Sequence, residues 1–133
     1  TLGGIITGLK NRKEVIGFSA LKGDFHQKDI GLLLNKVSDT LKVSDTYTNW
    51  AINTDYHFGG YAKFKPELID FINQFKQDTN IQLEPIYTGK LFYGIYDLIK
   101  NDYFPKGSSI LAVHTGGLQG IVGFNRRFGN LIK

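Results

Sequence analysis

The sequence contains no cysteine and no methionine, and it has only three prolines among its 133 residues. Without cysteine the chain forms neither disulfide bonds nor thiolate metal sites, and nothing in the composition demands an oxidising compartment. Because methionine is missing even from position 1, we expect these residues to be part of a longer translation product.

Long apolar runs are also missing. No stretch approaches the length of a membrane-spanning helix, and residues 1–10 lack the basic start and long apolar centre of a signal peptide. The three histidines, His26, His57 and His114, show no metal-ligand spacing such as HExxH. We therefore expect a cytoplasmic protein with no membrane partner and no metal site.

The residues that are present favour a globular domain. Apolar residues make up 41% of the chain and charged residues 21%, a balance typical of a folded core under a solvated surface. The net charge of +4 is spread along the chain, apart from small basic groups at 11–13 and 125–127. This mild bias favours a solvated surface over a strongly basic binding face.

Strand and helix patterns alternate along the sequence. Apolar spacing predicts helices over residues 1–10, 30–41, 66–75, 91–99 and from 117 towards 124. Apolar runs predict strands over 14–21, 47–55 and 109–113, with a short extended piece at 81–85. This order predicts an α/β fold with a mainly parallel sheet and helices on both faces.

Glycine pairs fall near the ends of the predicted elements, at Gly3–Gly4, Gly59–Gly60 and Gly116–Gly117. Taken singly, each pair is explained by the left-handed backbone conformation that turns require. If the strands run in parallel, however, the loops meet at one edge of the sheet, where α/β proteins bind ligands. We therefore expect a ligand site there, with tyrosine, threonine and histidine beside the glycines.

Four segments carry a resemblance to a known family. Glu84–Lys90 (EPIYTGK) resembles the DPVYTGK segment of D-cysteine desulfhydrase and the DPVYEGK segment of 1-aminocyclopropane-1-carboxylate deaminase. His57–Tyr61 resembles the family's GxxYG tyrosine loop, Val113–Gly117 its HTGG turn, and Thr1–Leu9 the helix that follows its SGGT phosphate loop. The segments occur in the family's order over nearly the whole chain.

The resemblance implies a pyridoxal-phosphate enzyme with a tryptophan-synthase-beta-like fold. Residues 1–133 would form the C-terminal portion of its large cofactor-binding domain. The family's Schiff-base lysine belongs to an upstream GNKxRK-like segment that is absent here, and Lys90 matches a different, non-catalytic position. We therefore expect residues 1–133 alone to be inactive.

By the same resemblance, Thr1 and the N–H of Leu2 would help to hold the cofactor phosphate, although an ordinary N-cap threonine is a compatible reading. Tyr61 and Tyr87 would be the two active-site tyrosines, acting as acid, base or orienting hydroxyls; ring packing is the alternative. The cofactor ring would lie against the turn formed by His114, Thr115, Gly116 and Gly117, for which strand-end packing is the alternative.

Thr88 is the most diagnostic position in the resemblance. The deaminases have a carboxylate there that faces the cofactor's pyridine nitrogen, and a neutral hydroxyl keeps that nitrogen protonated less well. The threonine therefore favours elimination from a substrate with a good β leaving group, unless Thr88 is simply the N-cap of the following helix.

The predicted activity is D-cysteine desulfhydration, a β-elimination that yields pyruvate, ammonia and sulfide, in a homodimer that binds no nucleic acid. Deamination of the cyclopropane amino acid is the first alternative. A nucleotide- or nucleic-acid-binding α/β module, with Tyr47–Trp50 and Asn125–Phe128 on its surface, is the second, although no GxGxxG or RNA-binding motif is present.

Overall fold

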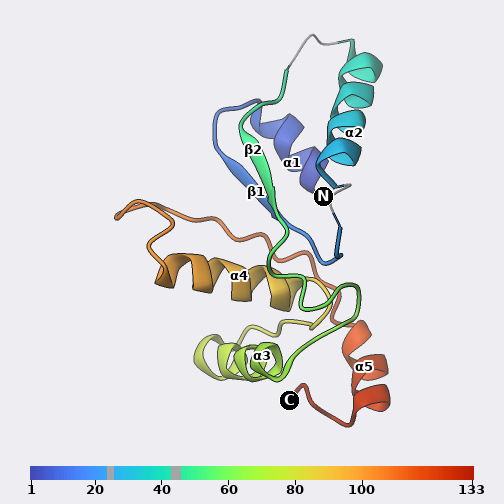
Figure 1. The fold of residues 1–133 in the computed structure, drawn as a ribbon, viewed down its shortest axis with the longest axis vertical. Coiled ribbons are helices and arrows are strands. Elements are labelled where there is room, and N and C mark those ends of the chain that lie inside the picture. The colour runs from blue at the N-terminus through green and yellow to red at the C-terminus, as the bar shows by residue number, and fades with distance from the viewer. Residues whose placement is uncertain (24–25, 43–45) are drawn as a thin grey trace.

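The computed structural model describes residues 1–23, 26–42 and 46–133 (Figure 1). The elements follow one another in the order α1 (Leu2–Leu9), β1 (Val15–Phe18), α2 (His26–Leu41), β2 (Trp50–Asn53), α3 (Pro66–Thr79), α4 (Thr88–Lys100) and α5 (Gly120–Phe128). This order confirms the predicted α/β class.

The strands β1 and β2 pair in parallel, with Val15 opposite Trp50 and Phe18 opposite Asn53. Successive side chains of a strand point to opposite faces, so Val15 and Phe18 lie on different sides. Val15 packs in a small core with Ile6 of α1 and Leu34 of α2. Phe18 lies against α4 on the other face, so helices contact both faces of this small parallel sheet.

The second core lies among α3, α4, α5 and the C-terminal residues, below the sheet in Figure 1. The helices α3 and α4 pack closely, because Gly89 leaves room for Ile72 where a Cβ atom would come within 2.5 Å of the Ile72 Cδ1. The buried apolar residues of this core are Leu68, Ile69, Ile72, Phe75, Leu83, Phe124 and Ile132.

The predicted strand over 109–113 is wrong. Among the described residues this segment has no strand partner, and Leu111 is 90% exposed. A run of apolar residues becomes a strand only when a neighbouring strand supplies hydrogen bonds, and the residues described here pair only β1 with β2.

Other boundaries differ by a few residues. The strand predicted over 47–55 is restricted to Trp50–Asn53, and the last helix begins at Gly120 rather than at 117. The helix α4 begins at Thr88, three residues before the predicted range 91–99. Of the glycine pairs, Gly3–Gly4 lies inside the first turn of α1 rather than in a loop.

Candidate functional site

The site is built where several loops meet the beginning of α4. The Lys90 side chain, in the first turn of α4, donates hydrogen bonds to the carbonyl oxygens of His57 and Gly60 at 2.8 Å each. It also reaches the carbonyl of Ala20, just after β1, at 3.4 Å. Gly117 approaches from the C-terminal turn, since a Cβ atom there would lie 3.1 Å from the Glu84 Cγ. Two of the predicted glycine pairs therefore do meet at one place.

Glu84 caps the start of α4, although its side chain is only 1% exposed. Its carboxylate accepts the backbone N–H groups of Ile86 at 2.7 Å, Tyr87 at 2.6 Å and Thr88 at 2.7 Å. A negative charge at a helix N-terminus is stabilised by the free N–H groups and the helix dipole. Sequence reasoning missed this role, for which the signal was an acidic residue four positions before the first helical residue.

Thr88 is the first residue of α4 and is 1% exposed. Its hydroxyl accepts the N–H of Glu84 at 3.0 Å and donates to the Glu84 carboxylate over a long 3.4 Å. The alternative interpretation of Thr88 as the N-cap is wrong, because Tyr87 occupies the N-cap position and the Glu84 carboxylate satisfies the first N–H groups.

Tyr61 and Tyr87 lie next to each other at the mouth of the site. Their ring centroids are 6.1 Å apart in an edge-to-face arrangement, and the side chains are 56% and 50% exposed. The hydrogen bond with the Tyr61 hydroxyl raises the pKa of Tyr87, and partial burial and the charge of Glu84 act in the same direction. Tyr87 therefore holds its proton at neutral pH.

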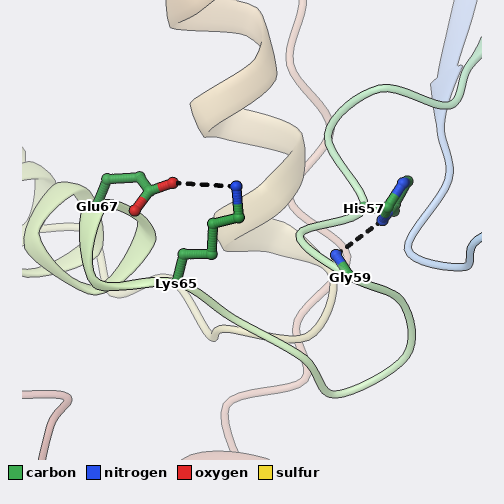
Figure 2. Close-up of polar contacts among 4 residues, drawn as sticks. All are labelled: His57, Gly59, Lys65 and Glu67. Atoms are coloured by element: carbon green, nitrogen blue, oxygen red, sulfur yellow. Dashed lines mark hydrogen bonds and ion pairs between the residues drawn. The ribbon is translucent and has the colours of Figure 1, made fainter.

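The loop before Tyr61 is fixed by its own hydrogen bonds. The N–H of Gly59 donates to the His57 Nδ1 at 2.8 Å (Figure 2), and the N–H of Gly60 donates to the His57 carbonyl at 3.0 Å. Both glycines have positive φ, +99° and +120°, which other residues rarely adopt. The glycines are thus required by the backbone path that presents Tyr61.

His114 organises the C-terminal turn. Its Nδ1 accepts the N–H of Gly116 at 3.0 Å, and its Nε2 lies 2.9 Å from the Gln82 carbonyl oxygen, so the neutral ring with the proton on Nε2 fits both contacts. Gly116 and Gly117 have φ of +86° and +88°. Thr115 is exposed. The turn is therefore tied to the segment that precedes Glu84.

Thr1 and Leu2 lie at the start of α1. Thr1 is the N-cap, but its side chain makes no capping hydrogen bond, so the first N–H groups of the helix stay available to an anion. Leu2 lines a cavity of about 200 Å³ together with Gly17 and Ser19 at the end of β1. Ser19 adjoins Ala20, whose carbonyl binds Lys90, so this cavity lies beside the loops around α4.

Burial lowers the pKa of Lys90 to about 8, and the nearby charge of Glu84 acts in the opposite direction. A lysine that is 1% exposed is tolerated here because its N–H groups have carbonyl partners. The electrostatics of the site thus depend on a buried carboxylate and a buried amine in the same stretch of chain.

The residues of the nucleic-acid alternative make contacts within the chain. The Asn125 side chain bonds both backbone groups of Ile132, and the Arg127 guanidinium lies 5.1 Å from the centre of the Phe128 ring. The Trp50 indole N–H donates to the Tyr47 carbonyl at 3.0 Å.

The part of the chain that the structure describes contains no helix long and apolar enough to cross a membrane. It also contains no group of three or more histidine or carboxylate side chains that could hold a metal ion.

No protein-family model matches the sequence. Over 127 residues the chain is 34% identical to a Pyrococcus furiosus protein provisionally named a 1-aminocyclopropane-1-carboxylate deaminase, a match that covers 90% of this chain and 37% of that protein. It is 25% identical over 132 residues to the 1-aminocyclopropane-1-carboxylate deaminase of Cyberlindnera saturnus, covering 96% of this chain and 39% of that enzyme.

A crystal structure described as an ACC deaminase homologue superposes with a TM-score of 0.83 and 28% identity. The match covers 99% of this chain and 41% of that one, so the chain spans about two fifths of the length of the proteins it matches. In both sequence and fold, the chain is therefore similar to 1-aminocyclopropane-1-carboxylate deaminases over this part of their length.

Proposed function

We propose that this chain is the C-terminal portion of the cofactor-binding domain of a pyridoxal-phosphate-dependent enzyme that acts on small amino acids. The remainder of the same polypeptide would supply the Schiff-base lysine, and the whole enzyme would be a cytoplasmic homodimer. The observation that carries the proposal is the pairing of Tyr61 with Tyr87 above the buried Thr88, at the point where the glycine loops meet.

The residues present fit the cofactor. The uncapped start of α1, with Thr1 and the N–H of Leu2, suits a phosphate dianion. The other end of the site offers the turn 114–117, whose glycine backbone would let a flat ring approach; Gly117 lies against Glu84, which accepts the N–H of Thr88. When bound, the cofactor supplies an electron sink for the negative charge that develops at the substrate α-carbon.

Under this proposal, Tyr61 and Tyr87 donate and orient a proton at the substrate. Tyr87 holds a proton on its Oη at neutral pH because its pKa is raised, so it is suited to donate a proton or a hydrogen bond to the substrate. Tyr61, whose hydroxyl is bonded to it, orients that proton. Glu84 keeps Thr88 and the Tyr87 backbone in place through the cap of α4.

The choice of reaction rests on Thr88. Its neutral hydroxyl donates to Glu84 only over a long 3.4 Å, so this group would serve as a hydrogen-bond donor to the pyridine nitrogen of a bound cofactor. A hydroxyl does not hold that nitrogen protonated as a carboxylate does, which favours loss of a good leaving group from the β-carbon. We therefore propose D-cysteine desulfhydration, which releases pyruvate, ammonia and sulfide.

Deamination of 1-aminocyclopropane-1-carboxylate is the second candidate, and the names of the relatives favour it. The test is to assay the full-length protein with D-cysteine and with the cyclopropane amino acid, after recording the visible absorption of bound pyridoxal phosphate. We expect sulfide and pyruvate from D-cysteine. Turnover of the cyclopropane substrate alone would overturn the argument from Thr88, and a colourless, inactive holo preparation would overturn the cofactor as well.

The tyrosine roles are tested by Y87F and Y61F in the full-length protein. Removing a positioned proton donor costs about 10²–10⁴-fold in rate, so we expect kcat to fall by at least about 100-fold in Y87F. The Y61F variant should lose less, because Tyr61 acts through Tyr87. The matched control is Y103F, an exposed tyrosine beyond the end of α4, which should keep wild-type kcat. Equal activity of Y87F and wild type would contradict the proposed role.

A further inference from the structure

Lys90 connects parts of the chain that are far apart in sequence. Its ammonium group reaches carbonyl oxygens 70, 33 and 30 residues away, on Ala20, His57 and Gly60. An ammonium has three N–H donors and no acceptor, so the three carbonyls match its capacity. Because the side chain is 1% exposed, water does not satisfy these donors in their place.

The two short bonds both go to the glycine loop that precedes Tyr61. The His57 carbonyl already accepts the N–H of Gly60, and the Gly60 carbonyl accepts the N–H of Lys63 at 3.1 Å. Each carbonyl oxygen has a second lone pair, which Lys90 uses. The loop itself contains positive-φ residues between and after these carbonyls, Phe58 at +53° and Ala62 at +53° among them. A backbone of this kind persists only when its surroundings hold it.

The other end of the lysine lies in the first turn of α4, three residues after Tyr87. Lys90 therefore joins the backbone on which Tyr61 is carried to the helix that carries Tyr87. The Phe58 ring of the same loop packs edge-on against Tyr93 of α4, with ring centroids 4.9 Å apart, and Lys90 adds hydrogen bonds to this apolar contact.

We propose that Lys90 is a positioning residue: it holds the loop 57–61 against the start of α4 and thereby sets the separation of the Tyr61 and Tyr87 hydroxyls. This inference rests on the proposed function for its effect on catalysis, but not for its effect on the loop. Lys90 acts through backbone carbonyls and does not touch the substrate.

The test uses the full-length protein and the variants K90M, which keeps most of the side-chain volume, and K90A, which leaves space for a small amine. The matched control is K100M, an exposed lysine in the last turn of the same helix. Hydrogen exchange is measured for the backbone amides of residues 59–63 and, as an internal reference, for residues 68–72 of α3.

We expect exchange at residues 59–63 to rise by about tenfold or more in K90M and K90A, with residues 68–72 unchanged and K100M equal to wild type. Added propylammonium should restore slow exchange in K90A, whereas tetramethylammonium, which has no N–H donor, should not. The kcat of K90A should fall and recover in parallel with exchange, while KM changes less.

Unchanged exchange at residues 59–63, or an equal rise in α3, would overturn the positioning role. Failure of propylammonium to act on a folded K90A would also overturn it. If wild type turns over none of the substrates, the proposed function fails, and the exchange result still decides whether Lys90 holds the loop.

Discussion

Glu84 and Lys90 are the charged residues buried at the start of α4, each 1% exposed. Each is retained because its polar atoms are bonded: the carboxylate accepts backbone N–H groups, and the amine donates to backbone carbonyls. Buried charges of this kind cost several kcal/mol when they lose their partners. The stability of the site therefore depends on the individual hydrogen bonds made by the Glu84 carboxylate and the Lys90 amine.

Replacing Glu84 with glutamine removes the charge and turns an amide NH₂ towards backbone N–H groups. We expect E84Q to lower the free energy of unfolding by about 1.5–3 kcal/mol, the range for hydrogen bonds to a charged group. Urea unfolding of the full-length protein measures this change. The control is E67Q in the first turn of α3, whose exposed carboxylate lies 3.8 Å from Lys65 (Figure 2) and should contribute less than about 1 kcal/mol. Equal effects of the two substitutions would contradict the capping role of Glu84.

The lowered pKa of Lys90 makes stability depend on pH. In the folded chain this pKa is about 8, against 10.5 for the unperturbed group, so between these values the unfolded state binds more protons. The contribution of Lys90 to the free energy of unfolding therefore increases between pH 8 and pH 10.5. It is complete above pH 10.5 and lost once the pH has fallen through 8. The neutral amine keeps two N–H donors, so the folded state tolerates it.

The difference in unfolding free energy between wild type and K90M should accordingly grow by up to about 3 kcal/mol from neutral pH to about pH 10.5. Urea unfolding at several pH values measures it. The corresponding difference for K100M should stay flat. A constant difference for K90M would mean that Lys90 titrates normally.

At the scale of elements, α4 is positioned by two glycines on its packed faces. Gly89 admits Ile72 of α3, and Gly94 admits Phe18 of β1, where a Cβ atom would lie 2.5 Å from Phe18 Cε1. Tyr56 also contacts this face, and its hydroxyl bonds Asp97 at 2.8 Å. Burial and the bond with Asp97 raise the pKa of Tyr56 to about 12, so this link persists across the physiological range.

We predict opposite effects for alanine at two helical glycines. G94A forces a methyl group into Phe18 and Tyr56, and overpacking of this kind costs about 1–3 kcal/mol. G123A, in the exposed part of α5 where a Cβ atom meets nothing within 4 Å, should stabilise by about 0.5–1 kcal/mol through helix propensity. Denaturant midpoints of the full-length variants give both values. A stable G94A would show that α4 and β1 are not closely packed.

At the scale of the whole molecule, the described chain forms a sheet half, with α1, α2, β1 and β2, and a helical half, with α3, α4 and α5 (Figure 1). The halves meet where Phe18 contacts α4 and where Lys90 reaches Ala20. The apolar segment 109–113 lies extended, with Leu111 90% exposed and Ile110 40% exposed. Under the proposal that the chain belongs to a longer polypeptide, that remainder would cover this segment.

Hydrogen exchange tests this arrangement. Amides of residues 110–113 should exchange at least about tenfold more slowly in the full-length protein than in residues 1–133 alone, because a remainder that covers the segment would shield its backbone N–H groups from water. Residues 68–72, which are inside the core in both, should show a much smaller change. Fast exchange at 110–113 in both forms would mean that the segment stays uncovered.

Some features were determined by the sequence alone. The helical spacing of Leu68, Ile69, Ile72 and Phe75 predicted α3, and the apolar runs located both strands, because periodicity of burial is a local property of the chain. The motifs around Tyr61, Tyr87 and the turn 114–117 indicated the resemblance to the deaminases that the comparisons then confirmed.

Other features were decided only by the tertiary structure. Whether 109–113 pairs as a strand depends on a neighbour that the segment cannot specify by itself. The three carbonyls that accept hydrogen bonds from Lys90 belong to segments far away in the sequence. No local sequence pattern therefore indicates that this lysine connects them. The capping of α4 by Glu84 likewise required the backbone to turn back on the carboxylate. Side-chain spacing specifies local elements, whereas partners for buried polar groups are specified only when the chain has folded.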